Sequence, residues 1–257
     1  MNITFPRISV ITPSLNSSKY LEQAIQSVLA QNYPNFEHIV VDGRSTDGTL
    51  NILRKYPHLK YVSEPDKGQA DAMNKGFGMS TGTVIVYLNA DDFFAPGAFF
   101  CVIPYFEKGA KFVVGRIGVL HTDERNYIND GKATFEEMLR WWEMNAFCYN
   151  PVGYFYSREV QEQIGFNTEN HFTMDLEFLL NASLKFRMTK INSILGYYRC
   201  FPGTKTYGRS DIYTQLNDLR FLDTYLKYCS KEYTEKYMAD KQKYVAQMIS
   251  EQARNQT

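Results

Sequence analysis

The first 110 residues of this chain alternate strand-like and helix-like patterns, and this alternation restricts the fold more than any other feature. Short apolar runs predict strands, and stretches with apolar residues at helical spacing predict helices between them. The expected strands and helices, in chain order, are Arg7–Thr12, Ser17–Gln31, Phe36–Val41, Thr49–Lys55, Leu59–Ser63, Lys67–Met79 and Thr83–Leu88, with Asn16 or Ser17 as the cap of the first helix. Strands that alternate with helices predict βαβ units and a mostly parallel sheet. The sequence therefore predicts an α/β fold.

The pattern changes after about residue 110. Phe112–Leu120 predicts another strand, and the polar stretch His121–Gly131 predicts a turn. Helical patterns cover Phe135–Phe147, Glu159–Ile164, Phe172–Leu184 and Asp211–Ala253. Because no repeat or low-complexity linker separates the two parts, we predict one domain over residues 1–207 with halves at 1–110 and 111–207. A C-terminal helical extension is expected at 208–257.

Composition excludes several classes of protein. The chain has 28 Lys and Arg against 28 Asp and Glu, which argues against a nucleic-acid binder that relies on a positive field. Its four cysteines form no CxxC pair, which suits a reducing compartment. The N-terminus lacks the pattern of a signal peptide, and no apolar stretch approaches the ~20 residues that span a bilayer. We therefore expect a cytoplasmic protein without a transmembrane segment, and leave open peripheral attachment to the inner face of the membrane.

In a sheet of this kind, ligands bind beyond the carboxyl ends of the strands. The segments expected there are all polar: Pro13–Asn16, Asp42–Thr46, Glu64–Gln69 and Asn89–Phe93. The sharpest signal is Asp91-Asp92, since two carboxylates at the end of a buried strand are costly unless a cation binds them. Mg²⁺ or Mn²⁺ takes such oxygen ligands together with phosphate oxygens. The alternative is a solvated turn in which Asp91 caps a helix near Pro96.

Two further segments have a structural and a functional interpretation. The carboxylate of Asp42 can accept hydrogen bonds from a nucleotide base or ribose, or it can stabilise its own turn. Glu64–Gly76 combines a turn with a helix start, and helix N-termini favour phosphates. The alternative for this segment is an ordinary capped helix in which Lys67 and Lys75 are solvated.

Together these segments resemble the inverting family 2 glycosyltransferases. The matching stretches, in order, are Ser9–Asn16, His38–Thr49, Ser63–Gly76 and Tyr87–Pro96. The resemblance is close over Arg7–Phe99, weaker over Asn150–Thr206, and ends near Tyr207. It implies a GT-A fold, which is a Rossmann-like, mixed and mostly parallel sheet flanked by helices, here with a C-terminal helical extension.

The resemblance also implies a nucleotide-diphosphate-sugar donor. A UDP-sugar is expected because uridine is the commonest base in similar enzymes, with guanosine and thymidine as alternatives. The implied donor contacts are Pro13, Ser14, Asn16, Asp42, Asp66, Gly68, Gln69, Asp71, Asn89 and Ala90, with Lys205 near the diphosphate. The family's DxD metal motif falls on Asn89-Ala90-Asp91, which leaves Asp91 as the principal ligand of Mn²⁺ or Mg²⁺ and Asp92 as its helper. Phe201 stands where relatives commonly carry His, which puts a third protein ligand in doubt.

Sugar transfer also needs a group that accepts the proton of the acceptor hydroxyl. The resemblance implies Asp175, in the downstream acidic segment Phe172–Phe178, as this catalytic base, with Glu177 as the fallback. The alternative is that an acid in the first turn of a helix is favoured by the helix dipole alone.

The acceptor is expected to be a saccharide or a lipid-linked glycan in polysaccharide or glycan biosynthesis. Trp141, Trp142 and Tyr154 are predicted either as an aromatic platform for this acceptor or as core residues. A catalytically silent nucleotide-sugar-binding subunit is the main competing function, and Phe201 and Asn89 give it some support. A nucleotidyltransferase is less favoured, because no Gly-rich basic loop lies near the N-terminus. The sequence does not decide the oligomeric state.

Overall fold

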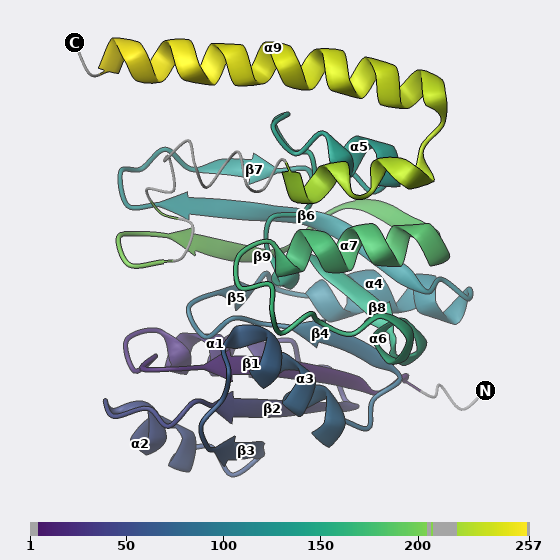
Figure 1. Cartoon of the computed structure of the whole chain (residues 1–257). Helices are drawn as coiled ribbons and strands as arrows, with labels where there is room; N and C mark the ends of the chain where they lie inside the picture. Colours follow the sequence, from purple (N-terminus) through teal and green to yellow (C-terminus); the bar gives the residue numbers. More distant parts are fainter. Residues whose placement is uncertain (1–4, 205–206, 208–219, 256–257) are drawn as a thin grey trace.

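The computed structural model describes residues 5–204, 207 and 220–255. One nine-stranded sheet runs through it in the order β3-β2-β1-β4-β8-β6-β9-β5, with β7 paired to β6 (Figure 1). The strands are β1 (Ile8–Ser14), β2 (Phe36–Asp42), β3 (Leu59–Ser63), β4 (Val84–Tyr87), β5 (Phe93–Phe94), β6 (Phe112–His121), β7 (Tyr127–Asn129), β8 (Tyr154–Ser157) and β9 (Met188–Cys200). The predicted mixed α/β sheet flanked by helices is therefore confirmed.

The first four strands are parallel, as predicted, and each lies within two residues of its expected bounds. Ser14 at the end of β1 pairs with Asp42, and Asp42 pairs with Ser63 at the end of β3. The chain therefore leaves these strands at one edge of the sheet, which we call the carboxyl edge.

The second half of the chain continues the same sheet. Strand β8 pairs antiparallel with both β4 and β6, so β6 runs parallel to β4, and β9 pairs parallel with β6. The carboxyl ends of β6 and β9, at His121 and Cys200, thus also face the carboxyl edge, on the left in Figure 1. The pattern along the chain did not predict β5, β8 or β9, and β7 lies inside the predicted turn.

Helices cover both faces of the sheet. They are α1 (Leu21–Leu29), α2 (Thr49–Arg54), α3 (Gln69–Met79), α4 (Ala98–Glu107), α5 (Phe135–Leu139), α6 (Arg158–Ile164), α7 (Met174–Lys185) and α9 (Lys231–Asn255), with 3-10 turns η1 (Pro151–Gly153) and η2 (Leu226–Tyr228). Side chains alternate along a strand. In β2, Ile39 and Val41 face α3, whereas Val40 packs in a separate cluster with residues of α1 and α2.

Two predictions about helix ends are corrected by the structure. The N-cap of α1 is Tyr20, so neither Asn16 nor Ser17 caps this helix. Asn16 is left-handed, with φ of 49°, and its Oδ1 accepts from the amide of Thr46 at 2.9 Å. Helix α5 ends at Leu139, because Arg140 leaves helical backbone angles with ψ of 48°. The predicted helix through Phe147 is therefore too long. The tail helix α9 begins at Lys231, and residues 208–219 of the predicted tail lie outside the described residues.

Helix α9 lies along the far side of the second half, at the top of Figure 1. Its Tyr237 is fully buried, and the ring of Trp142 packs on Tyr237 and Tyr244 at 5.2 and 5.8 Å between centroids. Arg140 forms an ion pair with Asp240 of α9. The helix is therefore docked on the domain by aromatic and ionic contacts.

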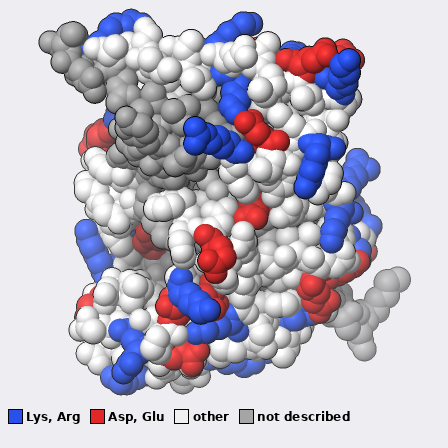
Figure 2. All heavy atoms as spheres, in the orientation of Figure 1, with Lys and Arg blue, Asp and Glu red and all other residues white. Residues whose placement is uncertain are grey.

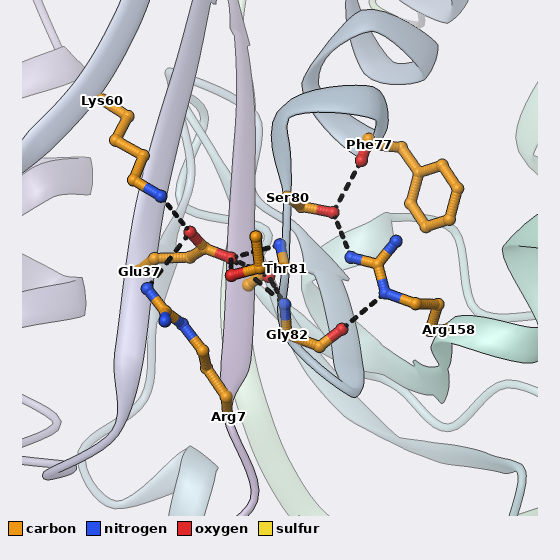
Figure 3. A network of polar contacts seen from close by, with 9 residues as sticks. Arg7, Glu37, Lys60, Phe77, Ser80, Thr81, Gly82 and Arg158 are labelled. Atoms are coloured by element: carbon orange, nitrogen blue, oxygen red, sulfur yellow. Dashed lines mark hydrogen bonds and ion pairs between the residues drawn. The ribbon is translucent and has the colours of Figure 1, made fainter.

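The edge opposite the carboxyl edge is closed by a polar network around Glu37 (Figure 3). The side chain of Glu37 is only 3% exposed, and it accepts hydrogen bonds from Ser9 Oγ at 2.7 Å, Lys60 Nζ at 2.7 Å and the Thr81 amide at 2.6 Å. Burial raises its pKa, but these bonds outweigh burial and bring the pKa down to about 2. Glu37 therefore joins β1, β2, β3 and the turn before β4.

Candidate functional site

Asp42 is held rigidly at the carboxyl edge. It is fully buried, and its carboxylate accepts from the Ser45 amide at 3.0 Å, from Ser45 Oγ and from Ser63 Oγ at 2.6 Å. Ser45 Oγ in turn accepts from the amide of Asn16 at 2.7 Å, which ties the turn after β1 to the turn after β2. The turn-stabilising role of Asp42 is thus present, and its contact with a nucleotide stays a prediction.

The turn after β3 packs against the turn after β2. Asp66 Oδ1 accepts from the amide of Gly68 at 2.8 Å, and Oδ2 lies 2.7 Å from where a Cβ on Gly43 would stand. Only glycine therefore allows this approach at position 43. The side chain of Leu15 borders the same spot and is 60% exposed. Three predicted donor-binding turns, which start at Pro13, Asp42 and Glu64, are thus brought together.

The polar residues at the start of α3 make two kinds of contact, local ones around Asp71 and one with Asn89. Asp71 accepts from the Lys67 amide at 3.0 Å, and this bond is the main reason that its pKa is lowered. Lys75 pairs with Asp71 at 3.4 Å and with Glu64 at 3.0 Å, so Asp71 is engaged in local contacts. Gln69 instead reaches forward, and its Nε2 donates to Asn89 Oδ1 at 2.9 Å.

The segment Leu88–Asp92, which we call the acid loop, carries two aspartates in different surroundings. Asp92 is fully buried. Its Oδ2 accepts from Asn89 Nδ2 at 3.1 Å and Asn150 Nδ2 at 2.7 Å, and its Oδ1 accepts from the Arg199 amide at 2.9 Å. Burial, and then the neighbouring Asp91, raise the pKa of Asp92 well above its usual range. Asp92 therefore shapes the acid loop, and its predicted helper role at a metal ion stays a prediction.

Asp91, unlike Asp92, reaches the surface. It is partly exposed, and among the described residues only its own amide donates to its carboxylate. Burial raises the pKa of Asp91, and the positive charge of Arg199 acts in the opposite direction. The alternative in which Asp91 caps a helix is wrong, because the N-cap of α4 is Gly97 and it receives no side-chain hydrogen bond.

The residues around Asp91 fit a metal ion that needs only one carboxylate ligand from the protein. Within the described part of the chain, no three His, Cys, Asp or Glu side chains gather as a metal site. The ring of Phe201 packs on Tyr20 at 5.1 Å, where the family resemblance would place a His. A single carboxylate suits an ion such as Mg²⁺ that takes its other ligands from phosphates and water.

Asp175 lies in the first turn of α7. Its Oδ1 accepts from the hydroxyl of Tyr154 at 3.3 Å, and Tyr154 begins β8, which runs antiparallel beside β4. Glu177 is engaged elsewhere, since it accepts from Nδ2 of Asn167 at 3.1 Å and of Asn170 at 2.7 Å. Both acids therefore accept hydrogen bonds within the chain, and the choice between Asp175 and Glu177 as the base stays a prediction.

The predicted aromatic platform is not assembled on the surface. Tyr154 is fully buried, and its ring stacks within the core on Phe178 at 6.4 Å. Trp142 packs on α9, and Trp141 packs partly buried against the main core cluster. These contacts favour the core interpretation of the three rings. Lys205, predicted near the diphosphate, lies outside the described residues.

Two residues that hold the acid loop were missed by sequence reasoning. Asn150 and Arg199 bind Asp92 although they lie 58 and 107 positions away from it. The segment around Arg199 is part of the family resemblance, but no local pattern marks its contact with the acid loop. Only the tertiary pairing of β9 brings it there.

The face of the molecule seen in Figure 2 shows no dominant charge. Lys and Arg are interspersed with Asp and Glu over this face. In the described residues, none of the helices has both the length and the apolar character that crossing a bilayer requires.

Comparison with known sequences gives one family. The model of "Glycosyl transferase family 2" matches residues 9–165. Over 177 residues the chain is 29% identical to a protein of Nostoc sp. described as an uncharacterized glycosyltransferase, which covers 62% of this chain and 53% of that protein. Over 130 residues it is 30% identical to chondroitin synthase of Escherichia coli, which covers 49% of this chain and 18% of that enzyme. The chain thus spans about half or less of the length of these relatives.

Solved structures share the fold. TarS residues 1–349 of S. aureus superpose with a TM-score of 0.65 at 20% identity, which covers 84% of this chain and 65% of that one. A mannosyltransferase from Pyrobaculum calidifontis, in complex with GDP-Man and Mn²⁺, superposes with a TM-score of 0.59 at 20% identity, which covers 80% and 59%. The predicted GT-A fold is therefore confirmed.

Proposed function

This chain belongs to glycosyl transferase family 2, and from this premise we propose that it moves a sugar from a nucleotide-diphosphate sugar to an acceptor hydroxyl with inversion. The acceptor is a saccharide or a glycoconjugate in polysaccharide or glycan biosynthesis. The observation that carries the proposal is the position of Asp91. It is a partly exposed acid at the end of β4, and Asp42 and Asp66 lie at neighbouring strand ends.

The donor is bound by the turns after β1, β2 and β3. Asp42 accepts an N–H of the base, for which we propose uracil, and its fixed position favours one orientation of the ring. Asp66 and Gly68 lie where the ribose and the sugar follow. A TarS structure contains UDP-GlcNAc and the mannosyltransferase contains GDP-Man, so the fold accommodates either base. In this scheme residues 1–110 bind the donor, 111–207 bind the acceptor and 208–257 form an extension.

Asp91 would hold Mn²⁺ or Mg²⁺ jointly with the donor phosphates. When bound, such an ion supplies Lewis-acid stabilisation of the charge on the leaving diphosphate. The chain itself contributes a carboxylate whose backbone is fixed. Asn89 links the acid loop to α3, since it accepts from Gln69 of α3 and donates to Asp92.

Asp175 is the proposed catalytic base. It takes the proton of the acceptor hydroxyl while that oxygen forms a bond to the anomeric carbon. The bond from this carbon to the diphosphate breaks, and the electron pair leaves with the nucleoside diphosphate. Attack from the face opposite the leaving group inverts the anomeric configuration. The hydroxyl of Tyr154 donates to Asp175 and holds its carboxylate in place.

The test combines thermal shift with transfer. Donor bound to the folded state raises the melting temperature, so UDP-, GDP- and dTDP-sugars with Mn²⁺ identify the base. Asp175→Asn keeps the shift and loses transfer by ~10²–10⁴-fold, whereas Asp91→Asn loses the Mn²⁺-dependent shift. The matched control is Glu177→Gln on the same helix, which keeps most activity. If Glu177→Gln abolishes transfer and Asp175→Asn does not, the base is assigned wrongly.

The same assay separates the competing functions. A catalytically silent nucleotide-sugar-binding subunit gives a thermal shift but neither transfer nor release of nucleoside diphosphate. A nucleotidyltransferase releases pyrophosphate instead.

We also propose a cytoplasmic location. All four cysteines are free thiols, which suits a reducing compartment. Fractionation of cells that express the chain, with a salt wash of the membranes, tests this location and any peripheral attachment.

A further inference from the structure

Arg199, the penultimate residue of β9, joins three parts of the molecule at the carboxyl edge. Its guanidinium donates through Nη1 to the main-chain oxygen of Asp91 and through Nη2 to Gln23 Oε1 of α1 at 2.5 Å. Its amide donates to Asp92 Oδ1 at 2.9 Å. One residue therefore binds both aspartates of the acid loop and the first turn of α1.

The guanidinium also packs on two aromatic rings. Its central carbon lies 4.5 Å from the ring centroid of Phe93 and 4.9 Å from that of Tyr20. Phe93 directly follows the acid loop, and Tyr20 caps α1. A planar cation that packs on two rings has little freedom to turn, so its hydrogen bonds have a defined direction.

We infer that Arg199 is a positioning residue for the donor site, and this inference rests on the proposed function. The carboxylate of Asp91 projects from a backbone whose carbonyl is held by Arg199. Fixing that peptide fixes the direction in which Asp91 meets an ion shared with the diphosphate. Residues that orient a metal ligand in this way commonly change metal affinity by ~10–100-fold when they are removed.

A guanidinium is needed at this position because two partners must be bound at once. Asp91 and Gln23 are contacted by two different nitrogens of one rigid fork. The ammonium group of a lysine is a single point on a flexible stem and does not reproduce this fork. Arg199→Lys therefore keeps the charge and loses the geometry, which makes it the informative variant.

The chain offers a matched control in Arg158, at the opposite edge (Figure 3). Arg158 also makes two side-chain hydrogen bonds, to the main-chain oxygen of Gly82 at 2.8 Å and to Ser80 Oγ at 2.7 Å. Its guanidinium carbon lies 4.7 Å from the ring centroid of Phe77. Arg158→Lys therefore removes a similar clamp without touching the carboxyl edge.

Calorimetry of UDP and Mn²⁺ binding to the full chain tests the inference without relying on turnover. We expect Arg199→Lys to weaken the Mn²⁺-dependent part of UDP binding by ~10-fold or more, with metal-free UDP binding changed little. Arg158→Lys should change melting temperature only. Gln23→Ala, which leaves Arg199 intact, should weaken Mn²⁺-dependent binding in the same direction by a smaller factor.

The outcomes are separable. If the wild-type chain binds no nucleotide diphosphate with Mn²⁺, the proposed function fails. If the wild-type chain binds it, and Arg199→Lys and Arg158→Lys both alter melting temperature alone, the proposed function stands and Arg199 is only structural. If Arg199→Lys does not fold, unchanged binding by Gln23→Ala overturns the inference.

Discussion

Asp91 and Asp92 are adjacent in the sequence, yet their surroundings give them opposite tasks. Asp92 is buried with donors from Asn89, Asn150 and Arg199 on its two oxygens. Asp91 is partly exposed and receives no such donors among the described residues. One acid therefore shapes the acid loop, and the other is available to a ligand.

This division predicts different effects of the same substitution at the two positions. In Asp92→Asn an NH₂ group replaces one carboxylate oxygen. This new donor faces the donors that bound that oxygen, so at least one buried polar group is left unpaired. We expect the free energy of unfolding to fall by ~1–3 kcal/mol. Asp91→Asn should change it by no more than ~0.5 kcal/mol, as is usual away from buried networks. Urea denaturation of both variants measures this, and equal stabilities would contradict the burial argument.

At the residue scale, the sequence shows where acids cluster but not which acid faces outward. An apolar strand that ends in Asp91-Asp92 marks the site, because carboxylates are unusual there. The donors that turn Asp92 inward come from Asn150 and Arg199, far along the chain. No local pattern encodes such contacts, so before the fold was known only the family resemblance set Asp91 ahead of Asp92.

Among the elements, α3 is the helix that packs most closely on the parallel strands. A Cβ on Gly76 would stand 2.3 Å from Ile11 Cγ2 and 3.3 Å from Val41 Cγ2. Gly78 lies two residues further along the same helix, is exposed and has nothing within 4 Å of that point. The two glycines therefore differ in packing but share a helical context.

Gly76→Ala should destabilise the protein by ~1–3 kcal/mol, because a methyl group does not fit between α3 and β1. Gly78→Ala should stabilise it by up to ~1 kcal/mol, because alanine is the better helix former and nothing opposes it. Thermal melts of the two variants beside the wild type give the comparison. A Gly76→Ala variant as stable as the wild type would mean that α3 stands further from β1.

The elements found from sequence are those with regular patterns. The strands β1, β2 and β4 are short apolar runs, which their burial on both faces requires. Strand β3 lies at the edge of the sheet and is only partly buried. Helix α4 was expected only as a helix near Pro96, without bounds, because it is apolar almost throughout and contains Pro104. Strand β9 was missed because register shifts against β6 break its alternation of buried and exposed residues.

Across the whole molecule, one sheet separates two polar edges of different character. The carboxyl edge carries partly exposed acids and the turns that we propose bind the donor. The opposite edge carries Glu37, whose carboxylate is surrounded by donors from β1, β3 and the turn before β4 (Figure 3). The second network closes the sheet and offers no free acceptor to a ligand.

Glu37 gives the stability of the whole chain a specific acid dependence. Its pKa is about 2 in the folded state and ~4.3 in an unfolded chain. Its contribution is therefore complete above the unfolded pKa and is lost as pH falls toward 2. The free energy of unfolding should drop more steeply over this range in the wild type than in Glu37→Gln.

Urea denaturation from about pH 5 to about pH 2 measures these slopes. The control is Glu159→Gln, because Glu159 pairs with Lys111 at 2.6 Å but its side chain is 46% exposed. Its slope should match that of the wild type. If all three proteins lose stability with the same slope as pH falls, Glu37 is not the source of the acid dependence.

The donors around Asp92 imply an order of assembly. Of its three partners, only Asn89 is a sequence neighbour, and the other two arrive with η1 and with the last strand, β9. The parallel strands β1 to β4, and the turns that we propose bind the nucleotide, can form from local βαβ units. Contacts of long sequence separation close later, because loop entropy opposes them. During refolding, a base pocket should therefore appear before the acid loop is organised, and recovery of Mn²⁺-dependent binding should trail recovery of the fold.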